Sequence, residues 1–560
     1  MKGVTMKVLL IPSAVIVPRE MRKKFGELPT ALFPLGNITM LEHIIKQYSG
    51  LVDQIYVVTS EKKELIEDYV SIKKLPVKII ELDRVSTLGY TILSGIKCVA
   101  EDNGHIDYLY INFADSLLDA SIPKDEHDFA YYATIRENDL WTYFISKESK
   151  IADIKDKNGK TINASSFENE NKIFIGVFGI NDASALKQLL EKYEHTSAID
   201  PFYQALYDYS EQKGEFDLIS TTKWLDVGHA ENYLKAKTNV AARAFNTINI
   251  DEERGILKKT SDNKVKLVNE ISWYLKLPNK LQYLFPRIYD YSLDLSEPYV
   301  SMEYYGYHTL HELLVYGNVT LAKWQNIFKK LQCAISDMEN YRVFSTKPEF
   351  ENSMNDIYLN KTFTRLDKIR EDSAFSAFFT NPININGRQY LSLNEYIALL
   401  PKLINKLVIS TFNGYFNIIH GDLCFSNILI EDTYNFVRLI DPRGKFGGFD
   451  IYGDERYELA KLLHTMEGNY DFIIEDMFDV SVDGSHISFQ MKRSAQDVLE
   501  IFKEVFSDRL VNIAGIRLIE ATLFLSMIPL HSDYPKRQYA MLATGIQLLQ
   551  QVLEEQENGI

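Results

Sequence analysis

The sequence predicts two domains: an α/β domain with a mostly parallel sheet over residues 1–240, and an α+β domain over residues 241–560. The chain has 560 residues, and roughly 100–200 residues per domain allow two to four domains. Strand and helix patterns alternate in the first part, which indicates a parallel sheet with helices on both faces. The pattern then changes to a short strand-rich part and long helices, so the boundary is expected near Ala241.

In the first domain, short β-branched and aromatic runs predict strands, and apolar residues with helical spacing predict the helices between them. The strands are Val8–Ile11, Ile55–Val58, Val77–Ile80 and Tyr108–Phe113; the helices lie around Leu41–Tyr48 and over Thr87–Ala100. In such sheets ligands bind beyond the carboxyl ends of the strands. Asp115 follows the strand Tyr108–Phe113, so it is placed where chemistry would occur.

In the second domain, the strand-like stretch Asn246–Lys259 precedes a helical stretch around Glu270. Long helical patterns follow over Leu321–Leu407, and a compact strand-rich segment over Phe416–Ile440. Helices are predicted from there to the end of the chain.

Composition and charge exclude several classes of partner. The net charge is −16 with no Lys/Arg-rich block, which argues against nucleic acid and against docking on anionic lipid. The three cysteines, Cys98, Cys333 and Cys424, lack metal-ligand spacing and indicate a reducing compartment. No run approaches the roughly 20 apolar residues of a membrane span. We therefore expect a cytoplasmic chain with small-molecule substrates, no nucleic acid and no membrane insertion; the oligomeric state stays open.

The N-terminus admits two interpretations. Lys2 and Lys7 precede the apolar run Val8–Val17, as in a signal peptide. The same run fits a buried first strand, which we favour because strand and helix patterns follow it in regular order.

The most informative segment runs from Ile418 to Ile430, and the run Leu439–Gly444 follows it. Phosphoryl transfer requires positioning and charge neutralisation more than covalent chemistry. Asp422 would orient an acceptor hydroxyl and take its proton. Asn427 and Asp441 would supply the oxygen ligands that Mg²⁺ prefers.

This segment resembles the Brenner motif, H-G-D-x-x-x-x-N followed by a metal-binding Asp, of the aminoglycoside phosphotransferase and choline kinase family. The resemblance implies a bilobal kinase-like fold, Asp422 as the catalytic base and His420 as a structural support of the catalytic loop. It also implies Asn427 and Asp441 as Mg²⁺ ligands. A buried polar turn and an inactive kinase fold are the alternatives.

The resemblance also assigns residues that bind ATP. Lys259, in preference to Lys258, would reach the phosphates, and Glu270 would pair with it from a helix. The segment Val300–Tyr305 resembles the inter-lobe hinge, where backbone groups around Glu303 would meet the adenine. For each charged side chain the alternative is a solvated surface group.

The residues after Asp441 weaken a choline assignment, because choline kinases carry an aromatic residue and an acid there. Here the run is Pro442-Arg443-Gly444. Arg443 would either bind an anionic acceptor or form an ion pair with Asp450 or Asp454.

The first domain resembles the GT-A-like nucleotidyltransferases that activate sugar phosphates and phosphocholine. Three pieces carry the resemblance: Pro29–Asn37 with Met40–Ile45, Tyr110–Asp115, and Trp224–Tyr233. It implies that Asp115 and Asp226 hold one Mg²⁺ against a nucleoside triphosphate, with Ile175–Phe178 beside the acceptor pocket. Alternatively, Asp226 caps a helix that starts near Glu231, and Asp115 merely ends a strand.

The phosphate-binding part of this family pattern is altered. The glycine-rich loop is replaced by Pro12–Arg19, and the family lysine by Thr30. Arg19, Arg22, Lys23 or Lys24 would then replace the missing positive charge.

The leading hypothesis is a bifunctional enzyme that phosphorylates a small hydroxyl-bearing metabolite with ATP and Mg²⁺. The N-terminal domain would couple the product to a nucleotide from CTP or another NTP, giving an activated precursor of a surface polysaccharide. One alternative is a kinase with an inactive N-terminal domain that only binds nucleotide or sugar. A second is a regulatory protein in which both sites sense ligands.

Overall fold

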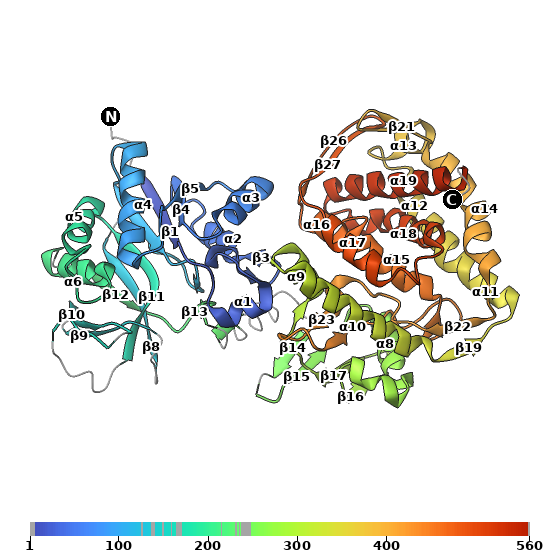
Figure 1. Ribbon diagram of the computed structural model, residues 1–560, viewed down its shortest axis with the longest axis horizontal. Coiled ribbons are helices and arrows are strands. Elements are labelled where there is room, and N and C mark those ends of the chain that lie inside the picture. The colour runs from blue at the N-terminus through green and yellow to red at the C-terminus, as the bar shows by residue number, and fades with distance from the viewer. Residues whose placement is uncertain are drawn as a thin grey trace. The chain divides into compact units, whose positions relative to one another are not determined.

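A computed structural model describes residues 6–124, 127–135, 141–147, 150–157, 159–163, 171–213, 216–229, 232–233, 236, 248–251 and 253–557. The chain divides into two compact units, Met1–Ala241 and Ala242–Ile560 (Figure 1). Each unit is described by itself.

The N-terminal unit is built on a nine-stranded sheet. Its main path has the order β10-β9-β11-β6-β1-β4-β5, and β8 pairs with β11 and with β12. β5, β4, β1 and β6 are mutually parallel, whereas β11 runs antiparallel to β6, β8 and β9. The strands are β1 (Lys7–Ser13), β4 (Gln54–Thr59), β5 (Lys78–Glu81), β6 (Tyr108–Asn112), β8 (Phe129–Ile135), β9 (Tyr143–Lys147), β10 (Lys150–Lys155), β11 (Asn171–Ile180) and β12 (Asp217–Ser220). The predicted α/β fold and its four strands are confirmed.

Helices cover both faces of the parallel strands (Figure 1). They are α1 (Arg19–Phe25), α2 (Met40–Gln47), α3 (Lys63–Lys73), α4 (Leu88–Asn103), α5 (Ala183–Tyr193) and α6 (Pro201–Lys213). Alternate residues of a strand point to opposite faces; Val8 and Leu10 of β1 share a core with residues of α4, α5 and α6. Leu9 and Ile11 are also fully buried. β1 is thus a central strand buried on both faces, as expected for a first strand and not for a signal peptide.

The C-terminal unit begins with a small antiparallel sheet of order β14-β15-β17-β16. Its strands are β14 (Ile248–Asp251), β15 (Ile256–Lys259), β16 (Ile288–Ser292) and β17 (Tyr299–Glu303), and helix α8 (Lys264–Lys276) packs on it. Trp273 and Ile271 of α8 are fully buried. This part corresponds to the smaller lobe of the predicted bilobal fold.

The larger part of this unit is mostly helical. Its main helices are α9 (Leu310–Val315), α10 (Leu321–Glu339), α11 (Lys347–Met354), α12 (Lys361–Arg370), α14 (Leu393–Leu407), α15 (Glu455–Met466), α16 (Tyr470–Ile474), α17 (Gln496–Val505), α18 (Ile513–Met527) and α19 (Pro535–Glu557). Short strands β22 (Tyr415–Ile418), β23 (Ile428–Ile430) and β24 (Val437–Leu439) lie between α14 and α15. β23 and β24 form the predicted hairpin.

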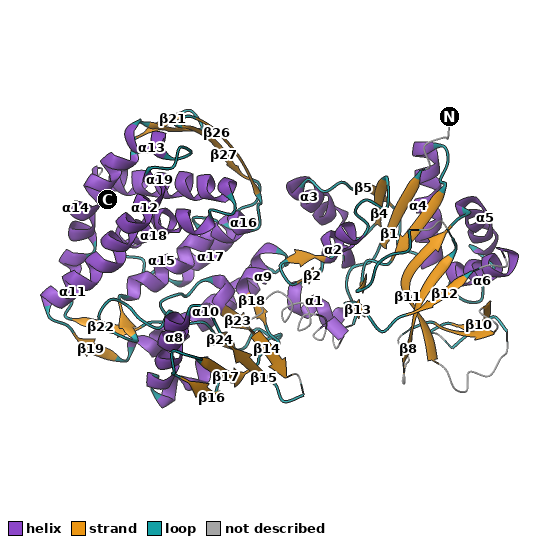
Figure 2. Ribbon diagram, turned by 180° about the vertical axis from the view of Figure 1, so that it is seen from behind, coloured by secondary structure: helices purple, strands orange, loops and turns teal. Residues whose placement is uncertain are grey.

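Two hairpins interrupt stretches that were predicted to be helical. β20 (Ile383–Ile385) pairs with β21 (Arg388–Tyr390), and β26 (Phe478–Asp483) pairs with β27 (His486–Met491), all in one sheet; Figure 2 shows β26 beside β27. Both turns contain residues of positive φ. They are Asn386 and Gly387 in the first turn, and Gly484, which follows Asp483, in the second. Asn-Gly and Asp-Gly between alternating apolar residues are strong hairpin signals, so the helical prediction was wrong there.

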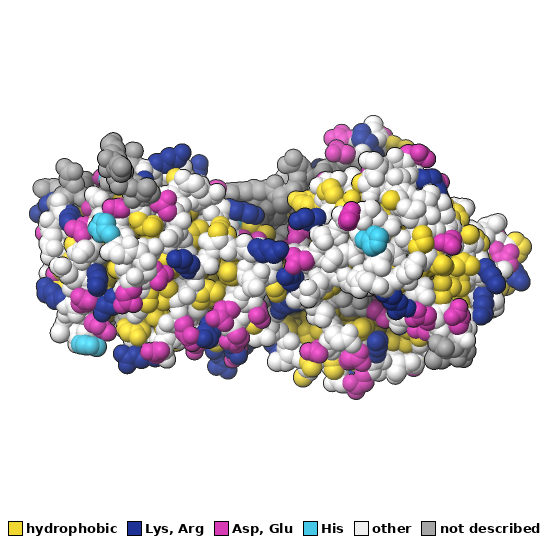
Figure 3. Space-filling view, turned by 90° about the horizontal axis from the view of Figure 1, so that it is seen from above, with side chains coloured by type: hydrophobic (Ala, Val, Ile, Leu, Met, Phe, Trp, Pro, Cys, Tyr) yellow, Lys and Arg dark blue, Asp and Glu magenta, His cyan; other side chains and the backbone are white. Residues whose placement is uncertain are grey.

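Among the described residues, one helical stretch, Ile513–His531, is long and apolar enough to cross a membrane. Of an 18-residue apolar segment within it, 83% is buried inside the protein. The stretch consists of the core helix α18, which packs against α15 and α19, and of the short 3-10 helix Ile528–His531. On the face shown in Figure 3, acidic and basic side chains are interspersed.

We expect residues 248–560 to fold without the rest of the chain. This unit has its own buried core and its own termini of regular structure. Soluble expression of this fragment, with one cooperative unfolding transition near that of the same unit in the full chain, is the expected result. An unfolded or aggregated fragment would mean that the two units share a core.

A buried ion pair joins α9 to α16 in the larger part. His311 Nδ1 contacts Asp471 Oδ1, and its Nε2 lies 3.5 Å from Glu475 Oε1. Burial alone would lower the pKa of His311, but Asp471 and then Glu475 raise it to about 10. Because the folded-state pKa lies above the unfolded value, this contribution to stability is complete below about pH 6.5 and is lost as the pH rises through about 10.

We therefore expect His311→Gln to lower the free energy of unfolding by about 3 kcal/mol at pH 6, and by much less at pH 10. Urea unfolding at both pH values measures the difference. His486→Gln removes an exposed histidine of the same unit and is the control. An equal effect of His311→Gln at both pH values would contradict the assigned ion pair.

Candidate active sites

In the C-terminal unit, Lys259 joins the two lobes through its ammonium group. Lys259 Nζ lies 2.9 Å from Glu270 Oε1 and 2.8 Å from Asp441 Oδ1. Burial raises the pKa of Glu270 to about 7, and Lys259 opposes that rise. Lys259 and Glu270 are therefore paired as the sequence predicted, with Asp441 as a third member of the group.

The predicted catalytic loop, which contains His420 and Asp422, is held by buried polar contacts. Glu458 of α15 accepts hydrogen bonds from the backbone N–H groups of His420 (3.0 Å) and Gly421 (2.8 Å). Burial lowers the pKa of His420 to about 4, so the ring is neutral. Its Nε2 lies 2.8 Å from the Ile440 carbonyl, and its Nδ1 accepts the N–H of Asp422. The proton is thus on Nε2, and His420 links the catalytic loop to the strand before Asp441.

Asp422, the predicted catalytic base, is bound to a cation. Lys461 Nζ of α15 lies 2.7 Å from Asp422 Oδ1. Burial alone would raise the pKa of Asp422, but Lys461 lowers it below its ordinary value. The carboxylate is therefore ionised and able to accept a hydrogen bond from an acceptor hydroxyl.

Asn427 and Asp441 have the free oxygens that a divalent cation would need. The Asn427 amide donates to the Asp422 carbonyl (2.9 Å) and to Asp422 Oδ2 (3.3 Å), which leaves its Oδ1 without a donor among the described residues. Asp441 uses Oδ1 for Lys259, and its side chain is 49% exposed. Mg²⁺ is usually bound by one or two protein oxygens together with substrate phosphates, so these two residues fit it.

Two glycines allow the close approach on which this site depends. Gly444 has φ +84°, and a Cβ there would lie 2.5 Å from the backbone carbon of Asn269, directly before Glu270. Gly421 has φ +76°, and its Cβ would lie 2.9 Å from Arg443 Cβ. Both positions require a residue without a side chain.

Glu303 lies at the predicted hinge. Its carboxylate accepts a hydrogen bond from Tyr305 Oη at 2.7 Å, and its N–H bonds to the Arg287 carbonyl. Adenine binding at Glu303 stays a prediction.

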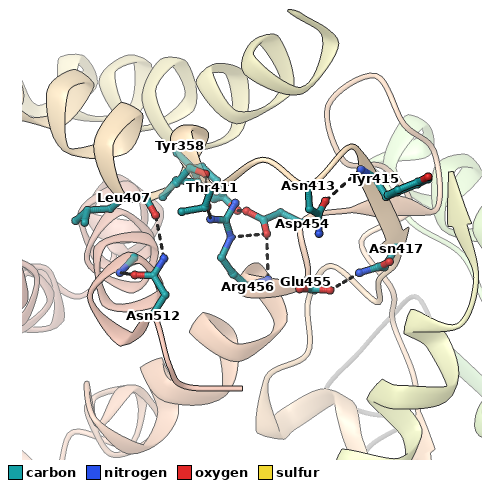
Figure 4. A network of polar contacts seen from close by, with 12 residues as sticks. Tyr358, Leu407, Thr411, Asn413, Tyr415, Asn417, Asp454, Glu455, Arg456 and Asn512 are labelled. Carbon is teal, nitrogen blue, oxygen red and sulfur yellow. Dashed lines mark hydrogen bonds and ion pairs between the residues drawn. The ribbon is translucent and has the colours of Figure 1, made fainter. Parts of the chain in front are cut away.

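Arg443 does not form either of the ion pairs that the sequence left open. Asp454 is bound by Arg456 Nε at 2.8 Å and by Tyr358 Oη at 3.0 Å, within the network that fixes the start of α15 (Figure 4). Asp450 pairs with Lys276 at 2.6 Å. Arg443 Nη1 instead donates to Tyr457 Oη at 2.8 Å.

In the N-terminal unit, a cavity of about 670 Å³ opens at the carboxyl end of the parallel strands. This volume is typical of a ligand site. Asp115 and Asp226 both line it, as do Trp141, Trp224 and His229.

The two predicted carboxylates lie side by side. Strand β13 (Trp224–Asp226) pairs with β7 (Ser116–Leu118), so that Asp226 is opposite Ser116. A Cβ on Gly228 would lie 2.7 Å from Asp115 Oδ2 and 3.2 Å from Asp226 Oδ1, so these oxygens are within about 6 Å of each other. Burial, and then the charge of Asp226, raise the pKa of Asp115 to about 6. The predicted proximity is confirmed, and the repulsion between the two acids fits a site for a cation.

Asp226 is also tied to the turn that follows it. It accepts hydrogen bonds from the Gly228 N–H (2.8 Å) and the Asn232 side chain (2.8 Å), and it contacts His229 Nδ1 (2.7 Å). In the alternative interpretation, Asp226 caps a helix that starts near Glu231. Glu231 lies outside the described residues.

The altered loop still lines the cavity, but its neighbouring arginines do not. Pro12–Ile16, Pro18 and Thr30 are among the lining residues. Thr30 Oγ1 donates to the Val15 carbonyl, and Arg22 Nε donates to the Val17 carbonyl at 2.7 Å. Arg19 is exposed. Neither Arg19 nor Arg22 belongs to the cavity lining.

Among the described residues that line this cavity, Lys157 is a cation that sequence reasoning missed. Its charge acts on the pKa values of Asp115 and His229. Lys157 follows β10, far along the chain from every motif that was recognised. Its only sequence signal is a charged residue just after an alternating strand.

Comparison with curated proteins finds relatives that match part of the chain. No family model matches the chain. Bifunctional protein GlmU of Methanococcus aeolicus is 29% identical over 156 residues, which are 26% of this chain and 36% of that protein. GlmU of Methanocaldococcus jannaschii is 27% identical over 155 residues, with the same shares. The chain thus spans about a third of the length of these curated relatives.

Solved structures of two kinds are also similar to parts of the chain. The CTP:phosphocholine cytidylyltransferase LicC of Streptococcus pneumoniae has a TM-score of 0.34 and 13% identity, covering 42% of this chain and 99% of that one. An aminoglycoside-3′-phosphotransferase of type VIII has a TM-score of 0.29 and 13% identity, covering 47% and 84%. The solved structures that are similar to parts of this chain thus include the two kinds of protein that its motifs resemble, a nucleotidyltransferase and an aminoglycoside phosphotransferase.

Proposed function

We propose that the chain is a bifunctional enzyme. Its C-terminal unit phosphorylates a small hydroxyl-bearing metabolite with ATP, and its N-terminal unit couples the phosphorylated product to a nucleotide. The observation that supports this best is the group formed by Lys259, Glu270 and Asp441, with ionised Asp422 in the adjacent catalytic loop. A protein that only sensed ligands would not need a base in this position.

In the kinase step, the acceptor hydroxyl donates a hydrogen bond to Asp422 and transfers its proton to that carboxylate. The acceptor oxygen forms a bond to the γ-phosphorus of ATP while the bond from that phosphorus to the ADP oxygen breaks. Lys259 binds the phosphates, and Glu270 holds Lys259 in place. Asn427 and Asp441 would hold Mg²⁺.

In the transferase step, an oxygen of the phosphorylated acceptor attacks the α-phosphorus of a nucleoside triphosphate, and the α–β bond breaks to release pyrophosphate. Asp115 and Asp226 would hold a divalent cation, and Lys157 would bind a phosphate group. When bound, the metal at either site would neutralise phosphate charge and so stabilise the transition state.

The nucleotide is proposed to be CTP, or another NTP, because the N-terminal motifs resemble those of transferases that activate sugar phosphates and phosphocholine. The product would be an activated precursor for a surface polysaccharide. We place both reactions in the cytoplasm, where ATP and nucleoside triphosphates are available.

The second candidate is a small-molecule kinase whose N-terminal unit binds nucleotide or sugar without catalysis. The observation that favours it is the loop from Pro12 to Pro18, where Thr30 takes the place of a lysine and neither Arg19 nor Arg22 reaches the cavity.

Stepwise assays distinguish the two candidates. The full chain is incubated with ATP, Mg²⁺ and a panel of alcohols, sugars and amino alcohols, and ADP is measured. Each phosphorylated product is then incubated with each of the four nucleoside triphosphates, and pyrophosphate is measured. We expect ADP with some acceptors and pyrophosphate with one triphosphate. ADP formation without pyrophosphate would favour the second candidate, and no ADP with any acceptor would contradict both.

A further inference from the structure

Four cationic side chains gather beside the proposed catalytic base, around the hydroxyl of Tyr457. They are Lys361, Arg365, Arg443 and Lys461. We infer that the kinase acceptor is an anion, a hydroxyl compound bearing a carboxylate or phosphate group, and that Lys361, Arg365 and Arg443 bind that group. This inference rests on the proposed kinase function.

The cluster is built from three separate elements. Lys361 and Arg365 are four residues apart on α12 and therefore lie on the same face of the helix. Tyr457 and Lys461 have the same spacing on α15. Lys361 Nζ lies 5.7 Å from the centre of the Tyr457 ring, and Arg443 Nη1 donates to the Tyr457 hydroxyl at 2.8 Å.

The cluster is directly connected to the catalytic loop. Arg443 donates its backbone N–H to the His420 carbonyl, and its side chain packs over Gly421, the residue before Asp422. Lys461 binds Asp422 itself at 2.7 Å. A group bound by these cations would therefore lie near the base.

Three of the four cations lack an acidic partner among the described residues. Lys461 uses Asp422, but Lys361 has only the Tyr457 ring, and Arg443 has the Tyr457 hydroxyl and ring. Arg365 Nη1 donates to the Ser526 carbonyl at 3.1 Å. The two acids that the sequence offered as partners of Arg443 form other ion pairs. Asp454 pairs with Arg456, and Asp450 pairs with Lys276.

The charges destabilise one another in the absence of a ligand. Burial, opposed by Tyr457 but reinforced by Arg443, Arg365 and Lys461, lowers the pKa of Lys361 to about 8. Burial and Arg443 also lower the pKa of Arg365. The pKa of Tyr457 is lowered despite its burial, because Lys361, Arg443 and Lys461 surround it. Uncompensated positive charge next to a binding site is the condition that an anionic ligand relieves.

The backbone at Lys361 is unusual as well. A π-helical turn, Asn355–Asn360, ends directly before it, and such turns occur frequently at functional sites. Tyr358 of this turn donates to Asp454, so the turn fixes the start of α12 against the start of α15. The pair Lys361 and Arg365 is thereby held on the side of Tyr457.

The cationic cluster is unsuited to an acceptor that is itself a cation. Choline or an aminoglycoside needs carboxylates or aromatic rings that are free of other cations. Here the carboxylate that contacts the cluster among the described residues, that of Asp422, is already bound by Lys461. The ring of Tyr457 already has Lys361 and Arg443 beside it.

The test compares acceptors of similar size and different charge on the full chain. Glycerol, glycerate, glycerol 3-phosphate and choline form one set; glucose, glucuronate and glucose 1-phosphate form the second. Binding is measured by calorimetry with and without a nonhydrolysable ATP analogue and Mg²⁺, and turnover is measured as ADP. Carboxylate and phosphate members separate the two kinds of anion. The variants are Lys361→Gln, Lys361→Arg and Arg443→Gln, with Lys368→Gln on the exposed side of α12 as the matched control.

We expect an anionic member of a set to bind at least about tenfold more tightly than its neutral counterpart. Lys361→Gln and Arg443→Gln should abolish that preference, whereas Lys361→Arg and Lys368→Gln should keep it. Without ligand, Lys361→Gln should leave the unfolding temperature unchanged or raise it, because it removes like-charge repulsion. A residue with only a structural role would give a lower unfolding temperature and an unchanged preference.

The inference is overturned if neutral members or choline bind as well as the anions, if no anion binds, or if the preference survives in both variants. Failure of the proposed kinase function has a different signature: anions bind, but the ATP analogue does not and no ADP forms.

Discussion

Asp441→Ala is expected to lower ATP-dependent phosphorylation by about a thousandfold or more, since loss of a metal ligand or a base removes several kcal/mol of transition-state stabilisation. Asp441 is bound by Lys259, and its side chain is half exposed, so the variant should remain folded. Asp422→Asn should have a comparable effect on turnover. It also leaves Lys461 without its carboxylate, and a lower unfolding temperature is therefore expected for that variant.

The measurement is ADP formation at saturating Mg²⁺, with unfolding followed in parallel. Asp450→Ala is the matched control: Asp450 is in the same loop as Asp441, its side chain is 61% exposed, and it pairs with Lys276 on the surface. Near-normal turnover of Asp441→Ala would show that the motif has been assigned wrongly.

Asp115→Asn is expected to reduce pyrophosphate release by about a thousandfold and to leave ADP formation unchanged. Burial and then the charge of Asp226 raise the pKa of Asp115, and a hydrogen bond from its own backbone N–H opposes that rise. Removing its charge should therefore not lower the unfolding temperature. Asp226→Asn should also abolish release, but it disturbs the contacts with His229 and Asn232.

Each single-site variant serves as the control for the other unit. Asp441→Ala, supplied with a phosphorylated acceptor, should still release pyrophosphate. Unchanged pyrophosphate release in Asp115→Asn would remove Asp115 from the proposed site, and loss of both activities in either variant would indicate general misfolding.

The catalytic loop could be predicted from the sequence because its chemistry is local. His420, Asp422 and Asn427 lie within eight residues between two apolar strands, and Asp441 ends the next strand. Because these residues are so close along the chain, their side chains must also lie close together in space, whatever the tertiary contacts are. Asp115 and Asp226 could also be predicted, because each follows an apolar run in a segment that resembles the nucleotidyltransferases. The pairing of β13 with β7 brings the two residues together in the structure.

The residues that support these sites could not be predicted in the same way. Glu458 and Lys461 reach the predicted catalytic loop from α15, and Lys361 reaches Tyr457 of α15 from α12. No spacing in the chain connects these residues with Asp422. Lys157 reaches the N-terminal cavity in a similar manner. Such contacts depend on how helices and strands pack, which periodicity alone does not define. The hairpins at Asn386-Gly387 and Asp483-Gly484 are different, because their turn residues are a local signal.

The central claim is that one chain makes a phosphomonoester and then consumes it. Phosphorus NMR of a single mixture tests this directly: full chain, Mg²⁺, ATP, CTP and the preferred acceptor. We predict that a phosphomonoester signal appears first, and that a nucleotide-linked diphosphate and pyrophosphate then replace it. In Asp115→Asn the phosphomonoester should accumulate, and in Asp441→Ala neither product should form. A phosphomonoester that persists in the unaltered chain, with every nucleoside triphosphate in turn, would contradict the account.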